Sequence, residues 1–326
     1  MTLNEALPLA LLASSLLPGL LIFMLPESRV RARTALNLSG AVAKLVLVGV
    51  LLVGVQAGET YSWRYAALPG IDLVFRADAL ALLFVSLSAV LWLLTTVYAI
   101  GYLEGSPHRS RFFGFFSLCV TATVGIAMAG NLFTFFVFYE LLTLATYPLV
   151  VHRGTAAAMR AGTIYLAYTL IGGAVLLTGI VWLHGLLGQT EFTPGGVASA
   201  LGPERAGDLR LIFLLLIAGV GVKAALAPLH GWLPQAMVAP APVSALLHAV
   251  AVVKAGAFGI VRIVYDVYGV DFAQSLDLLV PLALVAAATI IWGSLRALSQ
   301  TDLKKRLAYS TVSQVSYIIL GVALFG

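Results

Sequence analysis

Residues 220–262 read VGVKAALAPLHGWLPQAMVAPAPVSALLHAVAVVKAGAFGIVR, and this stretch decides how the rest of the chain is interpreted. It is apolar, yet it contains four prolines, at positions 228, 234, 240 and 242. Each proline removes a backbone donor and crowds the preceding turn, so the four cannot share one straight helix. We predict a helix to about residue 227, an interruption with a short helical piece near Pro228–Pro234, and a new helix from about residue 241.

A break of this kind has two interpretations. Non-helical backbone at membrane depth is tolerated only where other protein or a polar cavity surrounds it, and discontinuous helices recur at the ion and substrate sites of transporters. The other interpretation is an ordinary loop at the membrane surface, which suits Pro240 and Pro242 better than Pro228.

The whole chain has the composition of a membrane protein. Of its 326 residues, 61% are hydrophobic and only 10% are charged, against roughly 25% charged residues in a soluble domain. A spanning helix needs about 20 mostly apolar residues, whereas a closed barrel would show alternating segments of about ten. We therefore predict an all-α polytopic membrane protein with about ten transmembrane helices and a broken seventh helix. The predicted spans are residues 6–25, 36–56, 78–102, 111–129, 131–151, 160–185, 209–228, 241–264, 277–296 and 304–325.

The charges between these spans predict the orientation of the chain, because lysine and arginine gather on the inside of a membrane. With the N-terminus outside, the inside connections hold eleven basic residues and the outside connections five. The inside set is Arg29, Arg31, Arg33, Arg109, Arg111, Arg153, Arg160, Arg296, Lys304, Lys305 and Arg306. The outside set is Arg64, Arg76, Arg205, Arg210 and Arg262. The first arginines follow the first apolar run, so we interpret that run as a retained helix and not as a signal peptide.

Four charged residues are left inside the apolar spans, namely Lys44, Glu140, Lys223 and Lys254. An ionised group facing lipid at that depth costs several kcal/mol, so such residues usually mark functional sites. Lys44 is interpreted as a lysine that extends toward the arginine-rich inside end of its helix. Glu140 lies at a depth of about 14 Å. We expect it to face other helices, water or a basic partner; the alternative is a neutral carboxyl that joins two helices by hydrogen bonds.

Lys223 and Lys254 lie near the middle of their spans beside small residues, which suit close helix packing. Burial favours a neutral amine and a nearby carboxylate favours the ammonium, so a lysine between the two influences can bind and release a proton near neutral pH. His230 and His248 titrate in the same range, although a lone histidine often has only a structural role. The candidates for proton translocation are therefore Glu140, Lys223, Lys254, His248 and His230.

No other chemistry is indicated. Cys119, the one cysteine, can form no internal disulfide. The sequence contains no P-loop and no GxSxG, HExxH or CxxC motif. We therefore expect no catalytic residue, no cofactor, no metal site and no nucleic-acid partner.

Four motifs carry a resemblance to a known family. They are FVFYELLTLATYPLV at 136–150, GVGVKAALAP at 219–228, the stretch from His230 to Arg262, and TDLKKRLAYSTVSQVSYIILG at 301–321. In this order and spacing they resemble the antiporter-like proton-translocating subunits shared by respiratory complex I, membrane-bound hydrogenases and Mrp-type cation/proton antiporters. The variant HAVAVVKAG at 248–256 is most similar to the D-like subunits of Mrp antiporters.

The resemblance implies roles for five residues. Glu140 and Lys223 match the paired acid and lysine of the fifth and seventh helices. Lys254 matches a lysine of the eighth helix. His230 and His248 match histidines that only some members of the family have.

The resemblance also implies a division of the chain. Residues 1–103 would form helices 1–3, residues 104–265 a complete first five-helix repeat (helices 4–8), and residues 266–326 the start of a second, incomplete repeat. Family members have about fourteen helices with two inverted repeats. Because this chain ends at Gly326, we expect a truncated chain, an incomplete gene product or a chain completed by another subunit, and complete proton conduction by this chain alone is not implied.

Three functional hypotheses remain open. The first is a membrane subunit of a multi-subunit Na+/proton antiporter in the cell inner (cytoplasmic) membrane, with other membrane subunits as partners. The second is a proton-pumping subunit of a complex I-like or hydrogenase-type redox complex, in which the chain would be a translocase subunit. The third is a structural membrane subunit without transport. None of the three needs a catalytic site in this chain.

Overall fold

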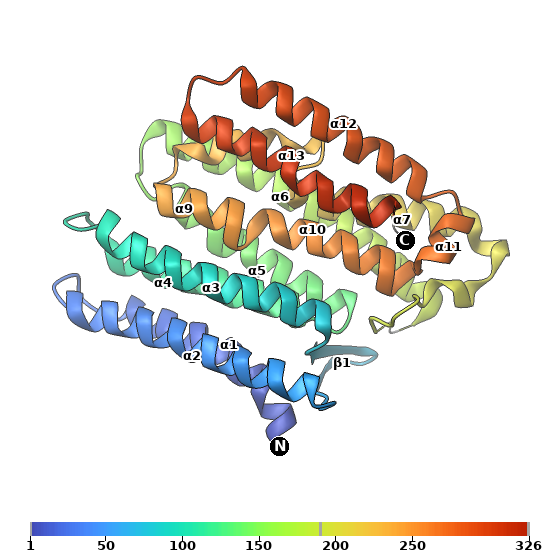
Figure 1. Ribbon diagram of the computed structural model, residues 1–326, viewed down its shortest axis with the longest axis horizontal. Coiled ribbons are helices and arrows are strands. Elements are labelled where there is room, and N and C mark those ends of the chain that lie inside the picture. Colours follow the sequence, from blue (N-terminus) through green and yellow to red (C-terminus); the bar gives the residue numbers. More distant parts are fainter. Residues whose placement is uncertain (1, 189–190, 325–326) are drawn as a thin grey trace.

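Ten membrane-spanning segments run side by side in the computed structural model, which describes residues 2–188 and 191–324 (Figure 1). The predicted number of spans is confirmed for the described residues. They are α1 (Leu3–Phe23), α2 (Val30–Gln56), α3 (Ala79–Tyr102), α4 (Arg109–Met128), α5 (Leu132–Val150), α6 (Ala156–Leu187), the segments Ala206–Val238 and Ala241–Tyr268, α12 (Leu279–Leu298) and α13 (Leu303–Leu324).

The connections alternate between two ends of the bundle, which we call inside and outside as the charge pattern predicts (Figure 1). Helices α1 and α2 form one edge, and α12 and α13 form the other. Between them, 83% of the residues in the apolar stretch of α4 and 78% of those in the segment Ala241–Tyr268 are buried, against 28% in α2 and in α12. These two central segments are therefore the natural place for ionisable groups that avoid lipid.

The seventh span is broken, as the prolines predict. Helix α7 (Ala206–Ala224) ends at Ala225, which has a φ of 57°, about three residues earlier than expected. A 3₁₀ turn (Leu229–Gly231), a short helix α8 (Trp232–Gln235) and a second 3₁₀ turn (Ala236–Val238) follow.

The eighth span is also interrupted, which the sequence did not predict. Helix α9 (Ala241–Ala245) passes into a π-helical turn (Leu246–Val250), and Ala251 then leaves the helical conformation with φ −133°. Helix α10 (Val252–Arg262), a further π-helical turn (Ile263–Tyr268) and α11 (Val270–Ser275) complete it. The span predicted from about residue 241 is therefore confirmed, but it is not a uniform α-helix. The π-turn contains His248, and such turns are frequent at functional sites.

A β-hairpin at the outside end was also not predicted. Strands β1 (Ser62–Leu68) and β2 (Ile71–Arg76) pair in antiparallel fashion between α2 and α3. Two 3₁₀ turns (Ala198–Leu201 and Pro203–Arg205) lie in the connection from α6 to α7. The outside surface is thus more ordered than the plain loops expected from the sequence.

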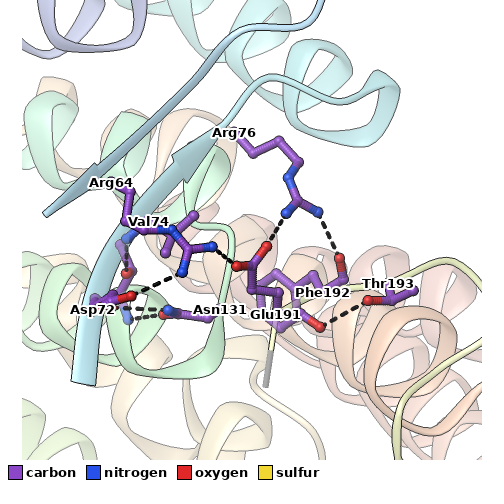
Figure 2. A network of polar contacts seen from close by, with 9 residues as sticks. Arg64, Asp72, Val74, Arg76, Asn131, Glu191, Phe192 and Thr193 are labelled. Carbon is purple, nitrogen blue, oxygen red and sulfur yellow. Dashed lines mark hydrogen bonds and ion pairs between the residues drawn. The ribbon is translucent and has the colours of Figure 1, made fainter. Parts of the chain in front are cut away.

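Ion pairs and hydrogen bonds fasten this hairpin to the helices (Figure 2). Arg64 and Arg76 both contact the carboxylate of Glu191, and Arg64 also pairs with Asp72 at 2.9 Å. Asn131 at the start of α5 donates a hydrogen bond of 2.9 Å to the carbonyl of Asp72. Several outside charges counted in the sequence therefore neutralise one another.

Two charged residues are not where the sequence predicted. Lys44 is 0% exposed and donates a hydrogen bond of 2.7 Å to Ser15 Oγ, so the prediction that it extends to the inside surface is wrong. The buried face of α2 turns this lysine toward α1 and α3. Arg262 is 3% exposed and pairs with Asp78 at 2.8 Å and with Asp266 at 2.6 Å. It belongs to a buried ion cluster and not to a surface connection.

Candidate functional site

The centre of the candidate site is an ion pair between α5 and α7. Lys223 Nζ lies 3.9 Å from Glu140 Oε1. The lysine side chain is 0% exposed and the glutamate side chain is 20% exposed. The ammonium also donates a hydrogen bond to the carbonyl of Tyr139 and lies 3.2 Å from the centre of the Tyr139 ring. Burying an ammonium without such partners would cost several kcal/mol. Helix α5 supplies these partners, the Glu140 carboxylate and the Tyr139 carbonyl and ring, and they stabilise the charge of Lys223.

Tyr139 fixes the separation of α5 and α7. Its hydroxyl donates a hydrogen bond of 3.0 Å to the carbonyl of Gly219, one turn before Lys223. Its own carbonyl accepts from Lys223 at the same time. One residue therefore holds both the helix that carries the lysine and the lysine itself.

Small residues let the neighbouring helices approach the pair. The carboxylate of Glu140 lies against Gly173 of α6, where an added Cβ would be 2.8 Å from Glu140 Cδ. Gly256 of α10 lies against the end of α7, where an added Cβ would be 2.6 Å from the carbonyl carbon of Lys223. Because α6 and α10 pack closely against the pair, Lys223 is enclosed by protein, while a fifth of the Glu140 side chain stays exposed.

The break after Lys223 is stabilised from two sides. Trp232 Nε1 donates a hydrogen bond of 2.7 Å to the carbonyl of Val222, which also accepts one of 3.1 Å from the amide of Ala225 where the helix ends. The amide of Ala227 donates 3.1 Å to Thr289 Oγ1 of α12. The lysine therefore lies in the last turn of a helix whose end is held in place.

His230 lies in the break and faces the last two helices. Its Nε2 accepts a hydrogen bond of 3.2 Å from Trp292 Nε1 of α12. The Tyr309 ring of α13 lies 6.2 Å from its ring centre. This histidine thus contacts α12 and α13, and among the described residues it makes no recorded contact with the Glu140–Lys223 pair.

His248 lies in the π-turn near the inside end. Its Nε2 is 3.0 Å from Met237 Sδ, and its Nδ1 is buried without a partner among the described residues. Lys304 of α13 donates to the carbonyls of Met237 (2.9 Å) and Ala239 (2.6 Å). The residues just before the segment that carries His248 are therefore joined to α13 through a lysine that the sequence placed only among the inside charges.

Lys254 points away from the ion pair. It lies two residues before Gly256, which faces α7, and so about 200° around α10. It lines a largely apolar groove of about 160 Å³ between α3, α10 and α13, with Phe84 and Ile318. The five predicted residues therefore divide, since the structure joins Glu140 to Lys223 and distributes the other three over other contacts.

Sequence reasoning missed the supporting groups. Tyr139, Trp232 and Lys304 were not selected, because an aromatic side chain or an inside lysine is common in any membrane protein. Tyr139 stands next to Glu140, which is the one signal that pointed to it.

Comparisons with known proteins give the family. Residues 129–326 match the family described as NADH:quinone oxidoreductase/Mrp antiporter, TM. Residues 63–113 match NADH-Ubiquinone oxidoreductase (complex I), chain 5 N-terminus. NADH-quinone oxidoreductase subunit N of Desulforudis audaxviator (strain MP104C) is 36% identical over 303 residues, which cover 90% of this chain and 57% of that protein.

Solved structures share the fold. A chain of the Mrp complex from Dietzia sp. DQ12-45-1b has a TM-score of 0.85 and 26% identity, covering 100% of this chain and 60% of that chain. A chain of respiratory complex I from Thermus thermophilus with bound Aureothin has a TM-score of 0.72 and 26% identity, covering 97% of this chain and 64% of that chain. This chain therefore spans less than two thirds of the length of each of these relatives.

The ten spans, the broken seventh helix and the solved relatives define a multi-pass membrane protein with the antiporter-like fold. The chain belongs to the NADH:quinone oxidoreductase/Mrp antiporter family, and the family predicted from the sequence motifs is confirmed.

Proposed function

We propose that this chain is an antiporter-like membrane subunit of a multi-subunit Mrp-type cation/proton antiporter, in which Glu140 and Lys223 form the proton-relay pair. The observation that carries the proposal is a fully buried ammonium 3.9 Å from a carboxylate, in the last turn before a helix break. The similarity to the Mrp complex chain supports the antiporter assignment. We further propose that Na+ is the exchanged cation and that the complex lies in the cell inner membrane.

The pair works through its mutual attraction. Attraction to Glu140 holds the proton on Lys223 against the cost of burying an ammonium. A charge that approaches the carboxylate weakens this attraction, and Lys223 then releases its proton. Because the two groups interact strongly, they bind and release protons as a unit.

The other ionisable candidates receive the proton later. Lys254 faces the groove beside α13, so we propose that it passes the proton toward the second repeat and not back to the pair. His230 contacts Trp292 of α12 and His248 contacts Met237 of the broken stretch, and we assign both histidines to this side of the path. In this proposal residues 104–265 form the first repeat, and other membrane subunits supply the driving charge movement.

A redox-driven complex is the second candidate. The 36% identity to NADH-quinone oxidoreductase subunit N favours it, because that protein is named for a redox complex. The same pair would then be driven by electron transfer in a partner subunit. The third possibility, a structural subunit, predicts that neutralising the pair has no effect on proton movement.

Inside-out membrane vesicles that carry the whole complex test the proposal. Lys223→Met should abolish the Na+-dependent collapse of a proton gradient, read by a pH-sensitive dye, while the complex still assembles. Lys305→Met is the matched control, because Lys305 is exposed and lies outside the site. Full activity of assembled Lys223→Met complexes would disprove the relay role. Proton uptake that follows an added electron donor and ignores Na+ would select the redox-driven candidate.

A further inference from the structure

Lys44 is buried in the middle of α2 among polar groups of neighbouring helices. It lies about 21 Å along the helix from Val30. Its Nζ donates a hydrogen bond of 2.7 Å to Ser15 Oγ of α1, and Thr121 Oγ1 of α4 donates 2.8 Å to the same oxygen. The amine also lies 4.9 Å from the centre of the Trp92 ring of α3. None of the ion pairs in the described part of the chain includes Lys44.

Two rows of buried polar side chains lead from this cluster to the inside end, where α2 and α4 begin. Residues spaced by three, four, seven or eleven positions share a helix face. The rows are Arg33, Asn37 and Lys44 on α2, and Ser110, Ser117 and Thr121 on α4. They meet at the inside end, because Arg33 Nη1 donates 2.9 Å to Ser110 Oγ, and they meet again at mid-depth through Ser15.

The rows begin at the surface with Glu27. Its side chain is 46% exposed and lies 3.8 Å from Arg33 Nη1. The carboxylate also accepts hydrogen bonds from the amides of Arg109 (3.0 Å) and Ser110 (2.9 Å) at the start of α4. An exposed carboxylate thus stands where inside water reaches the rows.

The rows are suited to hydrogen-bonded water along their length. Asn37 Oδ1, Ser117 Oγ, Trp92 Nε1 and Thr96 Oγ1 are buried without a partner among the described residues. Buried polar groups are usually hydrogen-bonded, and ordered water is the common partner where protein supplies none. Toward the outside the buried faces of α1 and α2 become apolar, with Val48 and Leu51 on α2 and Leu7 and Leu11 on α1, while α3 still carries the buried Ser88 one turn beyond Trp92. The polar rows on α2 and α4 therefore lead from Lys44 to the inside end.

Other ionisable groups on the surrounding helices lie near the helix ends or face elsewhere. Cys119 of α4 contacts Thr146 of α5. The remaining groups within α1 to α4 are Glu5 in the first turn of α1, Arg31 and Arg33 at the start of α2, Tyr98 and Tyr102 near the end of α3, and Arg109 and Arg111 at the start of α4. Tyr61, which follows α2, lies against Gly54. Among the described residues, the charged group that lies against the Trp92 ring is the amine of Lys44.

We propose that Lys44 is a second proton-binding site, reached from the inside along these polar rows and separate from the Glu140–Lys223 pair. A proton from inside water passes along the rows to the neutral amine and leaves by the same route. The resulting ammonium is held by the Ser15 oxygen and by the face of the Trp92 ring. The charge at the interface of α1 and α2 with α3 and α4 thereby follows the inside pH.

Trp92 provides a local reporter for the test. The whole complex is prepared with 5-fluorotryptophan, and the ¹⁹F resonance of Trp92 is assigned by its loss in Trp92→Phe. Between about pH 5 and pH 10, the range that buried and exposed lysines span, this resonance should shift along a sigmoidal curve. The shift should disappear in Lys44→Met and persist in Ser39→Ala, a control on the exposed side of α2.

A resonance that does not move with pH in the unmodified chain overturns the proposal, and this result needs no variant to fold. A titration that survives in Lys44→Met also overturns it, because another group would then be responsible. In sealed vesicles of known orientation, the resonance should follow a pH change only on the membrane face where the inside end of the protein lies. A response to the outside face alone would contradict the polar rows as the access route.

Discussion

Lys223 Nζ lies 3.9 Å from Glu140 Oε1 and at the same time donates a hydrogen bond to the carbonyl of Tyr139, the residue that precedes Glu140. The lysine is thus bound to the backbone of the same helix whose carboxylate attracts its charge. The backbone contact keeps the amine in place when the carboxylate is neutralised. A pair of this form can change its protonation while its geometry is retained.

Gly173→Ala should impair proton movement without unfolding the protein. An added Cβ would lie 2.8 Å from Glu140 Cδ and would displace the carboxylate from Lys223. A misplacement of about 1 Å can reduce a rate on the order of 100-fold, and we expect at least a tenfold loss of proton transport in vesicles. Gly185→Ala on the same helix is the control, because nothing lies within 4 Å of its added Cβ. Equal activity of the two variants would show that the position of the carboxylate is unimportant.

Trp232→Phe should destabilise the broken helix. It removes the 2.7 Å hydrogen bond to the carbonyl of Val222, which then keeps only the bond from the amide of Ala225. The net loss of one hydrogen bond costs about 0.5–1.5 kcal/mol, which should lower the thermal midpoint of the purified complex. Trp182→Phe, at a half-buried position on α6, should have a smaller effect. If both variants have the same thermal midpoint as the unmodified protein, the hydrogen bond from the Trp232 indole makes no measurable contribution to stability.

Arg262→Met should destabilise the outside end of the bundle. The change leaves Asp78 and Asp266 without the cation that lies 2.8 Å and 2.6 Å from them. Breaking a buried ion pair by removing one partner costs about 3–5 kcal/mol. Because Asp78 is partly exposed, we expect the free energy of unfolding to fall by about 3 kcal/mol. Denaturant unfolding measures it, with the exposed Arg205→Met as reference. A loss no larger than that of the reference would contradict a structural role for the cluster.

His152, in the inside connection between α5 and α6, should make stability depend on pH. Burial, and then the positive charge of Arg111, lower the pKa of its imidazole to about 4. An unfolded histidine has a pKa near 6.5, so between these values the unfolded chain binds more protons than the folded chain. The contribution to stability is therefore complete above about pH 6.5 and is lost as the pH falls toward 4.

Thermal midpoints of the complex measured across that window check this expectation. His152→Gln should reduce the loss of stability on acidification. An unchanged pH profile in His152→Gln would assign the acid sensitivity to other groups.

Much of the fold follows from the sequence alone. The ten spans were predicted because each crossing needs about 20 apolar residues, whatever the neighbouring helices are. The broken seventh helix followed from the prolines, whose effect on the backbone is local. Glu140 and Lys223 were selected because ionisable residues are rare at that depth.

Tertiary structure decided which ionisable groups meet. Lys44 and Lys254 are both mid-helix lysines, yet one is enclosed by α1, α3 and α4 and the other lines a groove beside α13. The π-turn at His248 is likewise not encoded by a proline, and Arg262 became buried because α3 brings Asp78 to it. Hydropathy fixes the depth of a residue in the membrane, but its partners depend on the helix that covers its face, and that is set by packing between residues distant in the sequence.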